Sequence, residues 1–291
     1  MKDIVYIVPL TPDTHLTPLR KLLRDITLLA LKNQTSGNWE ALLIGEYDKH
    51  DGNVIYLPAT APSVDYIKQT RDSAGATDKH FKIDVAMQYI ERQEKKPKYV
   101  ARLDDDDFIS PHIVSIIEKS GDNYDCFADK YQALVNVTNG KVCLANLAWM
   151  ANTVFHKYEH AKTLILEFGF SLINCSHNLG FHKYYAGKNV WHSEKGNPIY
   201  LRTLSPTNLS LSTQDKNTFE THVNRYGFWQ YKLLPDFEPY LSEFYKEYEI
   251  LTHTKINRNF SPFYRLQSFI SYLLYKRFNN LFPRLLGKLK D

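Results

Sequence analysis

Cysteine is scarce in this chain of 291 residues, which has only Cys126, Cys143 and Cys175. An odd, sparse set in apolar surroundings provides neither a disulfide framework nor the spacing of a metal site. A reducing, cytoplasmic compartment is therefore expected. No apolar run approaches the ~20 residues that a membrane-spanning helix needs. The opening segment, "MKDIVYIVPLTPD", meets polar residues too early for a signal peptide and is predicted to be a strand.

Glycine is missing from the first loop, "VPLTPDTHLTPLRK", where many nucleotidyltransferases and phosphotransferases carry a glycine-rich phosphate loop. This absence disfavours those enzymes. Internal repeats and low-complexity linkers are also absent. Hydrophobic residues at 43% and charged residues at 23% are typical of a soluble globular protein, and aromatic residues are enriched at 14%.

Acidic residues nearly disappear toward the end of the sequence. From Leu251 onward there are eight basic residues and one acid, a net charge of +7, so the first 250 residues carry −3 of the total of +4. Residues 231–291 are predicted to form a helical, basic amphipathic extension. Within residues 262–291 it could contact an anionic membrane surface, or it could dock on the domain. Its apolar stripe at helical spacing consists of Phe263, Leu266, Ile270, Leu273, Leu274, Phe278, Leu281 and Phe282.

Strand patterns alternate with helix patterns up to about residue 120, which predicts an α/β domain with a mostly parallel sheet. A Thr-Pro pair at 17–18 and a Ser-Pro pair at 110–111 are plausible helix starts. The expected strands are 3–10, 38–47, 53–59 and 98–103, and the expected helices are 16–34, 78–96 and 110–120.

After residue 123 the pattern changes. Two strands within 124–137 and 140–155 are predicted to be joined by the turn "TNG". A helix is expected over 158–173 and a strand with a loop over 196–213, and the last 70 residues are expected to be helical.

Four aspartates, Asp104 to Asp107, directly follow the strand predicted at 98–103. Ligands of open α/β sheets bind beyond the carboxyl ends of the strands, which is where these like charges gather. Asp104 and Asp106 are spaced so that both can face one Mg²⁺ or Mn²⁺ ion, which could bridge the two phosphates of a nucleotide-sugar. The alternative is a solvated acidic loop, or acids decorating a helix N-terminus.

The segment "RLDDDDFISP" resembles the D-x-D segment of the GT-A fold glycosyltransferases, particularly their family 2. "LLALKNQTSGNWEALLIGE" is similar to a segment of the same family, and residues 197–210 resemble one of its rhamnosyltransferase subfamily. The resemblance covers about residues 3–210. It implies a mixed, Rossmann-like sheet flanked by helices, with a GT-A domain over 1–230 that divides into a nucleotide-sugar half, 1–120, and an acceptor half, 121–230.

The same resemblance implies a set of site residues. Asp104 and Asp106 would bind the metal, with His177 or His192 as a further ligand, and Arg202 and Asn208 are candidates for substrate contact. The family usually ends its second strand in "DD" where this chain has "GEYD", so the nucleobase stays open. The implied nucleotide-sugar contacts are Pro9, Leu10, Thr11, Glu46, Asp48, Arg71, Lys79, Asp104, Asp105 and Asp106.

An inverting transfer needs a general base near the acceptor hydroxyl, for which Asp107, Asp129 and Glu167 are the candidates. A retaining outcome also stays open. The prediction is a hexosyltransferase that uses Mn²⁺ or Mg²⁺ to move a sugar from a nucleotide-sugar to a glycan or lipid-linked acceptor. Its setting would be bacterial surface polysaccharide synthesis at the inner face of the membrane, without nucleic acid. A Mg²⁺-dependent nucleotidyltransferase and a non-catalytic carbohydrate-binding protein of similar fold are the alternatives.

Overall fold

The fold was analysed in a computed structural model of the chain. The structure describes residues 1–45, 49–59, 74–145, 152, 154–166, 169–175, 181–194, 196–207, 219–220, 223–224, 226–258, 260–263, 265–267, 269–270 and 272–273. At 49–50, 74–77 and 182 it describes the backbone but not the side chains.

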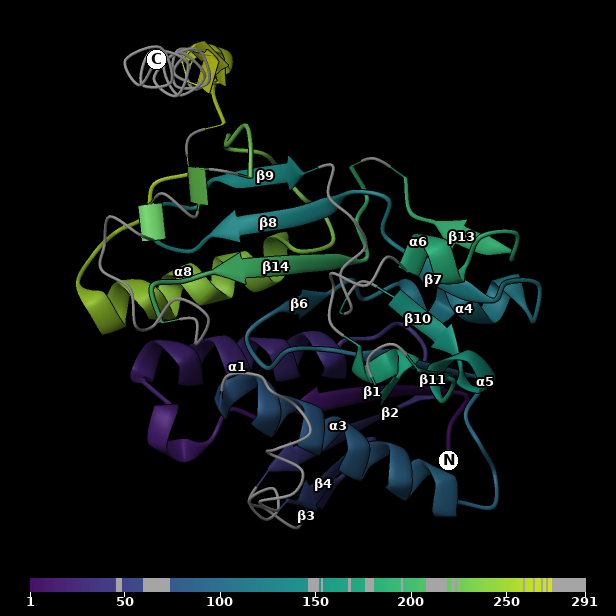
Figure 1. The fold of residues 1–291 in the computed structure, drawn as a ribbon. Coiled ribbons are helices and arrows are strands. Elements are labelled where there is room, and N and C mark those ends of the chain that lie inside the picture. The colour runs from purple at the N-terminus through teal and green to yellow at the C-terminus, as the bar shows by residue number, and fades with distance from the viewer. Residues whose placement is uncertain are drawn as a thin grey trace, which may run out of the picture.

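A mixed sheet of eight strands organises the protein (Figure 1). Its centre is parallel, because β1 pairs in the same direction with β2 and β5, and β2 with β4, whereas β10 runs antiparallel to β5 and β7. The predicted α/β class, a mixed sheet flanked by helices, is confirmed. The strand order is β13 (Val190–His192), β7 (Cys126–Ala128), β10 (Val154–Lys157), β5 (Tyr99–Arg102), β1 (Ile4–Pro9), β2 (Trp39–Gly45), β4 (Val54–Pro58) and β3 (Lys49–Asp51).

Helices cover both faces of this sheet because side chains alternate along its buried strands. On β1, Tyr6 belongs to the core shared with helix α1 (Pro18–Lys32), while Ile7 belongs to the core shared with α3 (Ala74–Arg92). The Thr17 side chain accepts a hydrogen bond from the Arg20 amide, and a proline begins α1, so the predicted start of this helix is confirmed.

A second sheet of four strands lies beside the first, in the order β6 (Phe108–Ile109), β14 (Tyr200–Leu204), β8 (Gln132–Asn136) and β9 (Val142–Ala145). The predicted hairpin at "TNG" is the β8–β9 pair, and Gly140 adopts the positive φ of 72° that its turn requires. β6 begins directly after the aspartates, so the aspartate run connects the two sheets.

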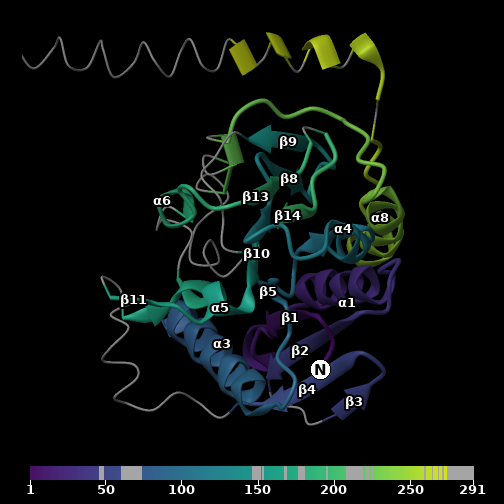
Figure 2. The same cartoon turned by 90° about the vertical axis from the view of Figure 1, so that its right-hand side faces the viewer.

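Helix α8 (Glu238–Thr252) packs within the main core, where Leu241 and Phe244 are fully buried together with Leu23 of α1. Beyond it, the described helical residues between 262 and 273 lie at one end of the molecule, past β9 (Figure 2). Phe263 is 70% exposed there and Leu266 58%. Among the described residues, no helix combines the length and apolarity that crossing a bilayer requires.

The helix predicted over 158–173 is wrong. Among the described residues of this range, α5 (Tyr158–Ala161) is the only α-helix, and a hairpin of β11 (Leu164–Ile165) and β12 (Phe170–Ser171) follows. Gly169 takes a φ of 71°, which favours glycine, and its amide donates to the Ile165 carbonyl to close the turn. A local turn therefore overrides the helical spacing of the apolar residues. The short elements η3 (Leu172–Asn174) and α6 (Phe181–Tyr184) come next.

Three further predictions of element boundaries are wrong. Helix α4 (Ile113–Ser120) begins later than the predicted Ser-Pro start, because the Ser110 amide donates to the Ile199 carbonyl and continues the sheet pairing. The strand predicted over 124–137 is divided into β7 and β8, and the strand predicted over 140–155 into β9 and β10. In each case the two strands belong to different sheets. A short helix, η1 (Asp13–His15), precedes α1.

Replacing Phe244 with alanine tests whether α8 is part of the cooperative core. The ring is fully buried, so Phe244→Ala is expected to lower the free energy of unfolding by about 3–5 kcal/mol in urea denaturation. Ile250 on the same helix is 64% exposed, and Ile250→Ala should change it by less than about 0.5 kcal/mol. Equal effects of the two changes would contradict the packing of this helix.

Candidate functional site

The four aspartates form a tight turn at the carboxyl end of β5, next to the end of β1. The Leu103 amide donates to the Ile7 carbonyl at 2.9 Å, and the Asp107 amide donates to the Asp104 carbonyl at 3.2 Å. The sequence predicted this position at the carboxyl edge of the parallel strands, and it is confirmed. The four side chains nevertheless have different surroundings.

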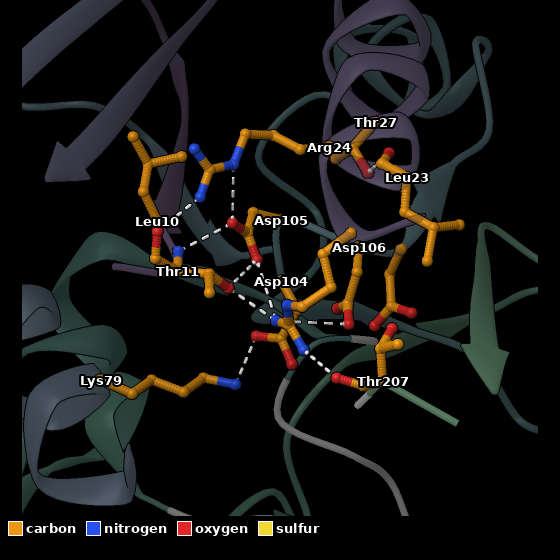
Figure 3. A network of polar contacts seen from close by, with 12 residues as sticks. Leu10, Thr11, Leu23, Arg24, Thr27, Lys79, Asp104, Asp105, Asp106 and Thr207 are labelled. Carbon is orange, nitrogen blue, oxygen red and sulfur yellow. Dashed lines mark hydrogen bonds and ion pairs between the residues drawn. The ribbon is translucent and has the colours of Figure 1, made fainter. Parts of the chain in front are cut away.

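Asp105 points into the protein and uses both carboxylate oxygens there (Figure 3). Its Oδ2 accepts from the Thr11 amide at 2.7 Å and from Arg24 Nε at 3.0 Å, and its Oδ1 accepts from the Thr11 hydroxyl at 2.9 Å. The residue is 5% exposed. These bonds make Asp105 a clamp that joins the loop after β1, β5 and α1, and its contact with the nucleotide-sugar stays a prediction.

Asp107 is turned toward the smaller sheet. Its Oδ1 accepts from the Thr203 amide at 2.7 Å, and its Oδ2 accepts from the Tyr200 hydroxyl. Burial, together with the nearby charges of Asp106 and Asp104, raises the pKa of Asp107 well above its usual range. With 2% of its surface exposed, this base candidate positions the loop against β14.

Asp104 and Asp106 are the aspartates best placed to meet a ligand. Their side chains are 27% and 10% exposed, and one oxygen from each lies within 4.8 Å of the other and of an Asp107 oxygen. Burial opposes the ionisation of Asp104, but Lys79 and Arg102 hold its pKa well below the usual range. Burial and the neighbouring carboxylates raise the pKa of Asp106 to about 6, against the opposing charge of Arg20.

Two arginines of α1, one turn apart, approach the aspartates. Arg20 Nη2 lies 3.6 Å from Asp106 Oδ2 and 3.7 Å from Asp105 Oδ1, and Arg24 binds Asp105 as described above. The Nε atom of Arg20 is buried and has no hydrogen-bond partner among the described residues. The sequence analysis missed both residues, although arginines four positions apart on an otherwise apolar helix face were a usable signal.

Two more cations complete the surroundings of the cluster. Lys79 of α3 forms an ion pair with Asp104, and the buried Arg102 of β5 donates from Nε to Asn152 Oδ1 at 2.8 Å. Four cationic side chains thus surround four carboxylates. The protein itself supplies the positive charge that the crowded aspartates need.

The donor set of this site fits Mg²⁺ or Mn²⁺. It consists of carboxylate oxygens, the hard ligands that both ions prefer. Asp105 and Asp107 each accept hydrogen bonds from two or more protein donors, whereas Asp104 pairs with Lys79 and Asp106 lies 3.6 Å from Arg20. Each carboxylate can accept about four hydrogen bonds or ligand contacts. Asp104 and Asp106 are the residues predicted to bind the ion.

The end of β1, where Pro9, Leu10 and Thr11 are predicted to contact the nucleotide-sugar, adjoins the cluster. Pro9 is the last residue of the strand, and the Leu10 carbonyl accepts from Lys82 Nζ at 2.7 Å. Lys82 is a buried cation that the sequence analysis did not single out. Its bond fixes the loop that Thr11 shares with Asp105.

Asp129, the second base candidate, is 2% exposed and holds the segment before β14. It accepts from the Ser193 hydroxyl at 2.5 Å and from the Ile199 and Tyr200 amides at 2.9 and 3.1 Å. Burial raises its pKa to about 7, although the three donors act in the opposite direction. Its contacts are those of a positioning residue.

The remaining candidates lie in different places. His192 is an exposed residue of β13 and is not in the carboxylate cluster. Arg202 of β14 lies 3.5 Å from the Tyr226 hydroxyl and within electrostatic range of Asp107. The candidates outside the described residues are Glu46, Asp48, Arg71, Glu167, His177 and Asn208.

Replacing Asp105 with asparagine tests the clamp. The neutral amide leaves the buried Arg24 without its charge partner, so Asp105→Asn should lower the free energy of unfolding by about 3–5 kcal/mol in urea. Asp51→Asn is the matched control, because the pair of Asp51 with Lys32 is about half exposed and should contribute at most about 1 kcal/mol. A loss of less than 1 kcal/mol in Asp105→Asn would contradict the clamp.

Comparisons with known proteins gave distant structural similarities. No protein-family model matches the chain, and no curated protein is similar to it in sequence. TarS of S. aureus matches with a TM-score of 0.44 and 12% identity over 78% of this chain, which spans 43% of the TarS chain. Rv0371c of Mycobacterium tuberculosis in complex with manganese matches with a TM-score of 0.32 and 12% identity, over 69% of this chain and 89% of its own. Mouse xyloside xylosyltransferase 1 matches with a TM-score of 0.38 and 9% identity, over 67% of this chain and 86% of its own. Similarity at this level leaves the function to be argued from the site.

Proposed function

We propose that the protein is a metal-dependent glycosyltransferase of the GT-A type, which transfers a hexose from a nucleotide-sugar to a glycan or lipid-linked acceptor. The observation that carries the proposal is the pair of carboxylates, Asp104 and Asp106, whose oxygens lie within 4.8 Å of each other at the carboxyl edge of the sheet. The end of β1 lies beside them, and Lys79 and Arg20 flank them. Carboxylates and cations at one edge suit a ligand that carries both a metal ion and phosphates.

A divalent ion bound by Asp104 and Asp106 would stabilise the negative charge that develops on the departing nucleoside diphosphate. The side chains around it have separate tasks. Asp105 and Arg24 hold the loop after β1, where the nucleotide would lie, while Asp107 orders β14. The site is thus organised before the donor enters, and preorganisation is what electrostatic catalysis requires.

The acceptor is proposed to bind on the side formed by residues 121–230, in an inverting reaction. Asp107, Asp129 and Glu167 remain the candidates for the base. Asp129 has a pKa near 7, which suits a general base, but its oxygens are engaged by backbone and serine donors. Bacterial surface polysaccharide synthesis at the inner membrane face is the proposed setting.

The C-terminal residues are proposed to contact the membrane surface peripherally. Phe263, Leu266 and Ile270 are 70, 58 and 48% exposed and recur at helical spacing, and the chain beyond Leu251 has a net charge of +7. An exposed apolar stripe on a strongly basic segment fits an anionic lipid surface, where each basic residue contributes about 1 kcal/mol.

Thermal denaturation with nucleotides tests the donor site. UDP and UDP-GlcNAc, which are present in structures of TarS, are the first ligands to use, followed by the guanine and thymine nucleotides. A nucleoside diphosphate with Mn²⁺ should stabilise the native state by about 2.7 kcal/mol at a hundredfold excess over Kd. Asp106→Asn should abolish the shift, and Asp51→Asn should retain it. The proposal fails if no nucleotide shifts the midpoint with or without Mn²⁺.

Flotation with lipid vesicles tests the membrane contact. Deleting residues 262–291 should release the protein from phosphatidylglycerol vesicles, and neither form should bind phosphatidylcholine. A Phe263→Ser, Leu266→Ser double variant keeps every basic residue and should bind at least tenfold more weakly, since two exposed apolar side chains are lost. Undiminished binding of the deletion variant would remove this part of the proposal.

A further inference from the structure

The cations around the aspartates differ in how firmly they are held. Arg24 binds Asp105 and also donates from Nη2 to the Thr11 carbonyl at 2.5 Å. Arg20 donates to the Thr11 hydroxyl at 2.6 Å and to the Thr207 carbonyl at 2.9 Å. Each arginine is therefore fixed by contacts that do not involve the metal-binding carboxylates.

Lys79 is held differently. Among the described residues, its ammonium group has one hydrogen-bond partner, Asp104. Lys82, one turn further along α3, is buried between the Leu10 carbonyl and Asp78. Lys79 is 29% exposed, and a lysine carries a compact charge on a flexible four-carbon stem. It is the cation of this group that can leave its partner without breaking other bonds.

Lys79 occupies a carboxylate that the metal ion also needs. Its Nζ contacts Oδ1 of Asp104, and Asp104 supplies one of the oxygens that lie within 4.8 Å of those of Asp106 and Asp107. A metal ion at the usual distance of about 2.0–2.1 Å from this carboxylate would lie close to the ammonium group, and the two cations would repel each other.

We propose that Lys79 is an exchangeable counter-cation, which neutralises Asp104 in the empty site and turns to the diphosphate when the donor and its metal ion bind. The inference rests on the proposed function and deepens it. Lys79 competes with a metal ion that arrives alone, and it attracts a diphosphate. Donor and metal ion therefore strengthen each other's binding through this side chain, and such coupling is reciprocal.

Removing the charge of Lys79 should change the two affinities in opposite directions. Lys79→Met keeps the apolar stem, and Mn²⁺ alone should bind it at least about fivefold more tightly than the wild type. UDP in the absence of metal should bind it more weakly by a similar factor. Free Mn²⁺ measured by electron paramagnetic resonance gives the first affinity, and calorimetry gives the second.

Two control variants separate this effect from a general loss of charge. Lys79→Arg retains the positive charge and should stay within about twofold of the wild type in Mn²⁺ affinity. Lys95→Met removes a charge from a 64% exposed lysine that pairs with Asp3, before the start of β1 and so at the end of the parallel strands opposite the aspartates, and should change neither affinity. Thermal denaturation confirms that each variant is folded.

The outcomes distinguish the inference from the proposed function. Equal Mn²⁺ affinity of wild type and Lys79→Met, with nucleotide binding intact, overturns the exchange but leaves the glycosyltransferase proposal standing. Weaker Mn²⁺ binding by Lys79→Met also overturns it, because Lys79 would then support the metal site. If neither protein binds Mn²⁺ or UDP, the proposed function fails and the inference fails with it.

Discussion

Four consecutive carboxylates after β5 have to be neutralised, and the rest of the site follows from how the chain does this. Arg24 and Thr11 engage Asp105 from the side of α1 and β1, and β14 engages Asp107. The side chains of Asp104 and Asp106 remain 27% and 10% exposed. The fixed bonds of Asp105 and Asp107 therefore leave Asp104 as the most exposed of the four carboxylates, with Asp106 beside it.

This division of tasks also connects the two sheets. The aspartate turn is the covalent link between β5 of the large sheet and β6 of the small one, and Asp107 binds Thr203 in the neighbouring strand β14. Removing one partner of a buried charged contact leaves an uncompensated charge, which costs far more than an exposed ion pair contributes. The position of Asp104 and Asp106 thus depends on the bonds that Asp105 and Asp107 make to other parts of the chain.

The sequence predicted the features that depend on local pattern. The first strand, α1 with its Thr17 cap, and the aspartates at the end of β5 all follow from periodicity and caps, and all are confirmed. It could not distinguish Asp105 from Asp106, because the difference arises from Thr11 and Arg24, which lie 94 and 81 positions away. The helix predicted over 158–173 is wrong for a local reason, because a short turn at Gly169 interrupts the apolar pattern.

Charge balance explains why such a site would take its ligands together. A divalent ion alone would add two positive charges beside Arg20, Arg24, Arg102 and Lys79, and a diphosphate alone would add about two negative charges beside the carboxylates. Either charge is unfavourable in a partly buried site, where the effective dielectric constant is well below that of water. With both ligands bound, the added charges cancel. Arg20 and Arg24 belong to this charge distribution and favour joint binding, although their ion pairs among the described residues are with Asp105 and Asp106 and not with Asp104, the carboxylate that Lys79 covers.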